Sequence, residues 1–175
     1  DLRVSGTSAN LAEGTVVAVT LNGKNYTATT AADGTWSLTV PAADLAGLGE
    51  ANYTLSATAT NGVGNSVSNT ANLLVDTALP TVIINTVAGD NVINAAEVAA
   101  GQTLSGTVAN AEAGNTVTVT IGGNSYTATV QNDLTWSVNV PESVLTALGN
   151  GDLTVSASVT NGHGNTGAGE REIVI

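Results

Sequence analysis

Oxygen-bearing side chains gather in one short stretch of the sequence, between Gly89 and Glu97. Asp90, Asn94 and Glu97 stand there close together, and the stretch has no other obvious task. A hard cation such as Ca²⁺ takes about six to eight oxygen ligands from carboxylates, amides and the backbone. The stretch could therefore bind calcium. The alternative is structural: Asp90 and Asn94 would form turns, and Glu97 would lie near a turn of helix.

Residues for covalent or acid–base catalysis are scarce. The sequence has no cysteine and a single histidine, His163, so any histidine-based triad or general base must use that residue. Phosphate-binding and dinucleotide-binding fingerprints are absent. Trp36 and Trp136 could stack on sugar rings, but both stand in alternating strand patterns that favour burial between sheets.

Composition excludes two classes of partner. The chain has 175 residues with 14 acidic and 3 basic side chains, which gives a net charge of −11. A nucleic-acid-binding surface needs a basic stripe, and an anionic membrane surface also attracts basic residues. We expect neither partner, and no apolar run approaches the roughly 20 residues that cross a bilayer. With 42% hydrophobic and only 10% charged residues, the chain should fold.

The sequence repeats itself at a distance of 100 residues. Residues 2–65 align with residues 102–165 without a gap, and 31 of these 64 pairs are identical. The chain is therefore a tandem array. His163 aligns with Val63 of the first copy. A position that holds valine in one copy and histidine in the other is typical of a loop side chain without a specific chemical role. We expect no catalytic role for His163 and no enzymatic activity.

Residues 76–100 occur in the second copy only. Asp76 to Pro80 has the turn residues and the proline of a linker, so we place the boundary before Asp76. The predicted domains are residues 1–75, a partial repeat that lacks the first strand and loop, and residues 76–175, a complete repeat. Alternatively, the extra segment belongs to the first domain by domain swapping.

Apolar residues alternate with threonine within each copy. Val117, Val119 and Ile121 form one such run, and Gly122-Gly123 then turns the chain into a tight hairpin. The abundant threonine suits antiparallel strands that face the core on one side and water on the other.

A second pattern interrupts the strands once in each copy. Proline, apolar residues three and four apart and a terminal glycine, as in Pro141 to Gly149, predict one or two helical turns. With an opening strand near residues 81–86 and a closing strand near 173–175, a repeat has about seven strands. The sequence thus predicts an all-β chain of two tandem immunoglobulin-like β-sandwiches, the first truncated at its N-terminal side.

The ordered motifs resemble those of bacterial Ig-like repeats. They are Asp76-Thr77-x-x-Pro80, the stretch from Gly89 to Glu97, Ser105-Gly106-Thr107, Trp136-Ser137, Pro141 and Asn161-Gly162-x-Gly164-Asn165. Such repeats form the shafts of giant surface adhesins of Gram-negative bacteria that are exported by type I secretion. The resemblance implies an extracellular rod of domains whose junctions bind calcium. One departure is the loop at Asn61 and Asn161, where the family often has aspartate.

The strand order divides the expected calcium ligands between the two ends of the second domain. Asp90, Asn94 and Glu97 fall at the end that holds the short helix, and Asp76 and Asp133 fall at the opposite end, facing the first domain. Together with the resemblance, this predicts Ca²⁺ at the first group and at a domain junction formed by the second. Asp133 has the alternative of a plain turn residue, like its counterpart in the first copy.

The predicted function is a non-catalytic, calcium-rigidified spacer in the shaft of a secreted adhesin on the bacterial cell surface. It would support adhesion to host cells or biofilm formation as a monomer, with neighbouring repeats and host glycans or receptors as partners. The alternatives are a carbohydrate- or receptor-binding module and an accessory domain of a secreted enzyme. Four of the five tryptophan and tyrosine residues pair up between the copies, which argues against a binding site specialised in one of them.

Overall fold

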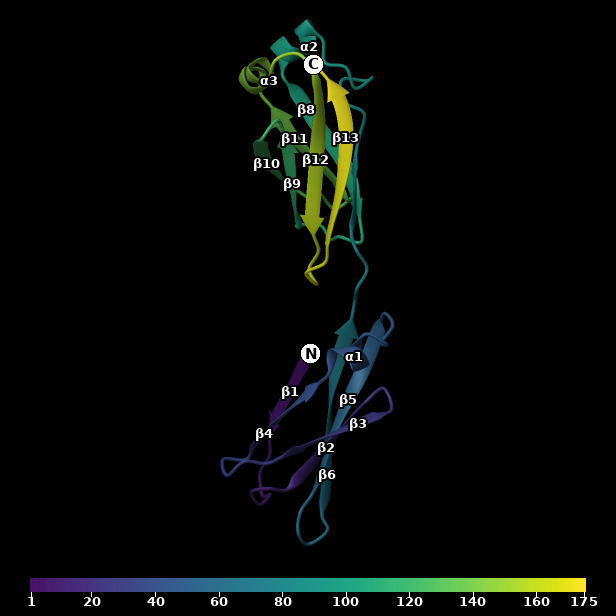
Figure 1. Cartoon of the computed structure of the whole chain (residues 1–175), viewed down its shortest axis with the longest axis vertical. Helices are drawn as coiled ribbons and strands as arrows, with labels where there is room; N and C mark the ends of the chain where they lie inside the picture. The colour runs from purple at the N-terminus through teal and green to yellow at the C-terminus, as the bar shows by residue number, and fades with distance from the viewer. The chain divides into compact units, whose positions relative to one another are not determined.

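The computed structural model describes all 175 residues, and the chain divides into two compact units. Unit 1 is Asp1–Asp76 and unit 2 is Thr77–Ile175. Both consist of antiparallel strands arranged in two sheets, joined by tight turns and short helices (Figure 1). The predicted all-β, immunoglobulin-like fold is confirmed.

Unit 1 has six strands and one short helix. In chain order they are β1 (Leu2–Thr7), β2 (Val16–Leu21), β3 (Lys24–Thr29), β4 (Thr35–Val40), α1 (Ala42–Leu45), β5 (Ala51–Thr60) and β6 (Ser66–Val75). One sheet has four strands in the order β3-β2-β5-β6, and the other has only β1 and β4.

Unit 2 has seven strands and two short helices. In chain order they are β7 (Thr81–Ile84), α2 (Ala95–Ala100), β8 (Gln102–Ala109), β9 (Thr116–Ile121), β10 (Asn124–Thr129), β11 (Thr135–Val140), α3 (Glu142–Leu148), β12 (Asp152–Thr160) and β13 (Thr166–Val174). Its sheets have the orders β10-β9-β12-β13 and β11-β8-β7, so β7 is the strand that unit 1 does not have.

The alternation read from the sequence appears directly in β9. Val117, Val119 and Ile121 are fully buried, whereas Thr116 and Thr118 are exposed and Thr120 is half-buried. The two-residue turn to β10 has positive φ at both glycines, as its sequence predicts. Local sequence therefore determines which face of β9 is buried and where the strand ends.

The two units differ in how completely their cores are covered. Twenty hydrophobic residues of unit 2 form one buried cluster, with Trp136 only 1% exposed. The corresponding cluster in unit 1 contains three buried residues, Val17, Val19 and Ala59, and Trp36 stays partly exposed at its margin. Burial of tryptophan between the sheets is therefore complete in unit 2 alone.

The closing strand is longer than the sequence predicted. We expected it near residues 173–175, but β13 begins at Thr166. The sequence did not predict this part of the strand because it contains Gly167 and Gly169, and glycine is a poor strand former. They are needed there because a Cβ at position 167 would lie 1.7 Å from the carbonyl oxygen of Pro80, just before β7, and a Cβ at position 169 would lie 2.1 Å from that of Val82 within β7.

The loops and helices of unit 2 lie at two opposite ends of its sandwich. α2, α3 and the C-terminus are at one end, and the loop between β12 and β13 is at the other (Figure 1). At the first end, Ile93 N donates to the carbonyl of Val174, and Val174 N donates to that of Asn91. These bonds fix the stretch from Gly89 to Glu97 against the end of β13.

Candidate functional site

The stretch from Asp90 to Glu97 forms a turn and the start of α2. Asp90 Oδ1 accepts a hydrogen bond from Val92 N at 2.9 Å. Asn94 Oδ1 accepts from Ala96 N and Glu97 N at 3.0 and 3.2 Å, while Glu97 Oε2 accepts from Asn94 N at 2.9 Å. Asn94 and Glu97 thus form a reciprocal capping box, which satisfies amide donors at the helix start. The Asn-x-x-Glu spacing was the sequence signal for α2.

Asp133 lies in the turn before β11, at the opposite end of unit 2. Its Oδ1 accepts from the Thr135 hydroxyl at 2.7 Å and from Thr135 N at 3.1 Å. These two hydrogen bonds, the hydroxyl first, hold the pKa of Asp133 below its ordinary value. Asp33 makes the same pair of bonds to Thr35 in unit 1, so this arrangement belongs to the repeat.

Asp90 shares a surface depression with two other carboxylates. The depression has a volume of 390 Å³, and its lining includes Asp90, Asp152 and Glu172 together with Ile173 and Val174 of β13. The structure brings no three acidic or histidine side chains close enough to hold a metal ion. Asp76 is the last residue of unit 1 and directly follows β6. Calcium ligation by the predicted residues stays a prediction.

The loop between β12 and β13 uses its first asparagine as a turn former. Asn161 Oδ1 accepts hydrogen bonds from His163 N and Asn165 N at 3.1 and 2.9 Å. Asn61 makes the equivalent bonds in unit 1. Glu112 Oε2 also accepts from the Gly162 N–H at 3.0 Å, which ties this loop to its neighbour. In this loop the asparagine side chain therefore accepts hydrogen bonds from backbone amides and stabilises the turn.

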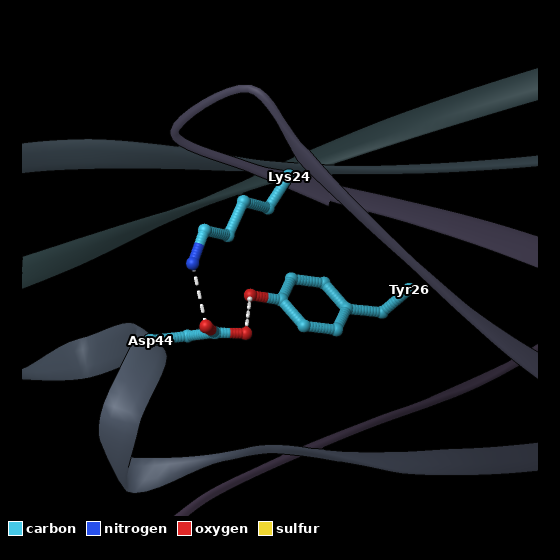
Figure 2. A network of polar contacts seen from close by, with 3 residues as sticks. All are labelled: Lys24, Tyr26 and Asp44. Carbon is cyan, nitrogen blue, oxygen red and sulfur yellow. Dashed lines mark hydrogen bonds and ion pairs between the residues drawn. The ribbon is translucent and has the colours of Figure 1, made fainter.

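One charged network occurs in unit 1 only. Lys24 Nζ donates to Asp44 Oδ1 at 2.5 Å, and the Tyr26 hydroxyl donates to Asp44 Oδ2 at 2.8 Å (Figure 2). The bond from Lys24, and then that from Tyr26, lower the pKa of Asp44. The network links α1 to β3. Unit 2 has Asn124 and Val144 in place of the charged pair, an asymmetry that the sequence alignment could have revealed.

A groove opens on the core of unit 1 between β1 and β6. It has a volume of 610 Å³, and its lining includes Val4, Trp36, Leu55 and Val67. No charged side chain lines it. The sequence analysis did not identify this groove. The alignment of the two copies contained the relevant observation, because residues 76–100 of the second copy have no counterpart among the residues of the first.

Comparison with known proteins agrees with this architecture. Residues 5–77 match the sequence profile of the bacterial Ig-like domain. The structure of a 1.5-MDa bacterial ice-binding adhesin, studied for host cell surface retention, is 30% identical over 99% of this chain, with a TM-score of 0.62. A Ca²⁺-stabilized adhesin that helps an Antarctic bacterium to bind ice is 33% identical over 98%, with a TM-score of 0.60.

The chain spans 56% and 42% of the lengths of these two structures, that is, about half. No curated protein sequence matches it. None of its helices has the length and apolar character needed to cross a membrane.

The predicted resemblance to repeats of large bacterial adhesins is therefore confirmed. The matched profile covers unit 1, and unit 2 repeats its strands in the same order and register. The chain belongs to the bacterial Ig-like domain family.

Proposed function

We propose that this chain is a segment of the shaft of a secreted bacterial adhesin, in which its repeats act as a non-catalytic spacer at the cell surface. The observation that carries the proposal is the repetition of one fold in the same register, with identity of 30% or more to two ice-binding adhesins. In this proposal residues 76–175 are one repeat and residues 1–75 are the matching part of another. The partners are then neighbouring repeats, with host glycans or receptors bound elsewhere in the adhesin.

Calcium is the second part of the proposal. One of the two similar adhesins is described as Ca²⁺-stabilized, and this chain has a net charge of −11. The local hydrogen bonds leave Asp90 Oδ2 and Glu97 Oε1 for a cation. Asn94 fits less well, because its Oδ1 caps α2.

Calcium would stiffen the array of repeats more than it would stabilise the fold of each repeat. Carboxylates near a linker repel one another, and a divalent ion converts this repulsion into attraction. Asp76, directly after β6, is the residue through which we propose that calcium restrains the linker, with Asp133 as a second ligand. A restrained linker keeps a spacer extended, because it removes the freedom of the segment between repeats.

Calcium titration by calorimetry and small-angle scattering tests this proposal. We expect weak binding, with a Kd of about 10⁻⁴ to 10⁻³ M. In chelator, the scattering should indicate a more flexible particle while the circular dichroism of the strands persists. The double variant Asp90→Ala and Asp76→Ala should lose calcium uptake, whereas Glu13→Ala, which removes an exposed loop carboxylate, should not. Unchanged uptake in the double variant would show that the proposed ligands are wrong.

A further inference from the structure

We propose that Asn22-Gly23, the turn between β2 and β3, is a site of spontaneous covalent modification, at which the asparagine becomes aspartate or isoaspartate through a cyclic imide. The inference rests on the contacts of the Asn-Gly pairs in the chain, and it is independent of calcium and of the adhesin role. The reaction needs only the chain and water.

The chemistry joins the side chain of an asparagine to the backbone of the next residue. The N–H of Gly23 loses its proton to the solvent, and the nitrogen forms a bond to Cγ of Asn22. The bond from Cγ to Nδ2 breaks, and Nδ2 takes up a proton and leaves as ammonia. Water then opens the imide: cleavage at Cγ gives aspartate, and cleavage at the main-chain carbonyl carbon gives isoaspartate. Glycine favours ring closure, because it has no Cβ that hinders the approach of its nitrogen.

The sequence contains four Asn-Gly pairs, which differ in what their reacting groups contact. The pairs begin at Asn22, Asn61, Asn150 and Asn161. Ring closure needs a side-chain amide that can turn toward the next nitrogen and a glycine N–H that can lose its proton. Every hydrogen bond that holds either group must break first, which raises the barrier.

Asn61 and Asn161 are held through their side chains. Oδ1 of each accepts two hydrogen bonds from backbone amides of its own loop. Asn161 is also only 6% exposed, and the Gly162 N–H that would attack it donates to Glu112 Oε2 at 3.0 Å. Both reacting groups of the Asn161 pair must therefore leave hydrogen bonds before the ring can close.

The Asn150 pair is held through its glycine. Asn150 and Gly151 are exposed, but Gly151 N donates to the carbonyl of Ile175 at 3.0 Å. Ile175 N donates back to the carbonyl of Gly151, also at 3.0 Å. This reciprocal pair of hydrogen bonds fixes the nitrogen that would attack the side chain.

Asn22 and Gly23 have neither restraint. Both are exposed, and neither the Asn22 amide nor the Gly23 N–H makes a hydrogen bond within the chain. Their φ values of 47° and 77° belong to a two-residue hairpin turn. Any rearrangement that ring closure needs is confined to this turn, which can open locally without exposing the core. Asn22 is therefore the asparagine with the fewest contacts to break.

The modification would alter the surroundings of Lys24. Asn22, Lys24 and Asp44 line one depression of 110 Å³. Aspartate at position 22 would add a second carboxylate near the ammonium group that already binds Asp44 (Figure 2). Isoaspartate would lengthen the main chain of a turn whose flanking residues, Leu21 and Lys24, are already paired. Unit 2 has Gly122-Gly123 at this turn and offers no amide for the reaction.

Peptide mapping of the full chain by mass spectrometry, during incubation at mildly alkaline pH, tests the inference. We expect Asn22 to react fastest, at least about tenfold faster than Asn161, because several hydrogen bonds hold the Asn161 pair and none holds Asn22. In urea that unfolds the chain, the four pairs should react at similar rates, since the dipeptide is the same.

Asn22→Gly is the matched control, because it gives unit 1 the turn of unit 2. This variant should lose the acidic species that appears first in ion exchange, with unchanged circular dichroism. Two results would overturn the inference. One is a rate at Asn61, Asn150 or Asn161 in the folded chain that equals or exceeds the rate at Asn22. The other is an intact Asn22 in the folded chain after the time in which the unfolded chain converts all four pairs.

Discussion

Leu134 occupies a backbone conformation that unit 1 gives to glycine. Its φ is 63°, and that of Gly34 at the matching place is 80°. A side chain in this region costs about 1–2 kcal/mol, and Leu134 is 37% exposed, so its burial offsets only part of this cost. We predict that Leu134→Gly stabilises unit 2 by up to about 1 kcal/mol, after the entropy cost of glycine. Denaturant unfolding measures this change.

The reverse substitution in unit 1 is the control. Gly34→Leu should destabilise it, because a Cβ there would lie 2.4 Å from the Ser8 carbonyl oxygen. Stabilisation by Gly34→Leu would contradict the explanation.

Asp133 gives stability that depends on pH. Its pKa is lowered in the folded chain by the hydrogen bonds from Thr135, chiefly that of the hydroxyl. Its contribution is therefore fully present above the ordinary pKa of about 3.8 and is lost as the pH falls through the lower folded value. We predict that Asp133→Asn lowers the melting temperature at pH 7, and that the difference from the unaltered chain disappears at strongly acidic pH. A difference that persists unchanged in acid would contradict this role.

His163 should tolerate replacement. Its counterpart, Val63, is 82% exposed in the same loop conformation, which depends on asparagine and glycine rather than on the residue between them. We predict that His163→Val changes the free energy of unfolding by less than about 0.5 kcal/mol. A change above about 1 kcal/mol in thermal unfolding would reveal a contact on which the loop depends.

At the scale of elements, β7 and β13 depend on a close approach of backbone. A Cβ at position 169 would lie 2.1 Å from the Val82 carbonyl oxygen, and Arg171 Nε donates to the Ile84 carbonyl at 2.7 Å just beyond it. We predict that Gly169→Ala destabilises unit 2 by about 2–3 kcal/mol, because one strand must shift. Asn69→Ala at the matching place in unit 1 should be nearly neutral, since no strand approaches there. Equal effects of the two variants on unfolding would contradict the prediction.

At the scale of the whole molecule, the two units should differ in stability. Unit 2 buries twenty hydrophobic residues in one cluster, and the cluster of unit 1 buries three. Since burial of apolar surface is the main stabilising contribution, we predict two transitions in calorimetry, with unit 1 unfolding first. Val19→Ala should lower only the first transition and Val119→Ala only the second. A single transition that both variants shift equally would contradict this.

The sequence by itself predicted the repeat, the antiparallel strands, the hairpin turns and the short helices after Pro41 and Pro141. These features depend on local rules: alternation determines which face of a strand is buried, and paired glycines permit a tight turn. It also offered turn roles for Asp133 and Asn94 and a place near a helical turn for Glu97, beside the calcium roles that stay predictions. The capping box of Asn94 and Glu97 emerged only in the structure.

Only the tertiary structure revealed the full length of β13 and the groove of unit 1. Gly167 and Gly169 look like strand breakers in the sequence, and their place in a strand is explained by the carbonyls of Pro80 and Val82, which are distant in sequence. The exposure of Trp36 likewise depends on a strand that lies over the same fold in unit 2 but is not present in unit 1. Local patterns specify which elements form, whereas contacts between distant segments decide which of their surfaces are covered, because burial is a property of the assembled sheets.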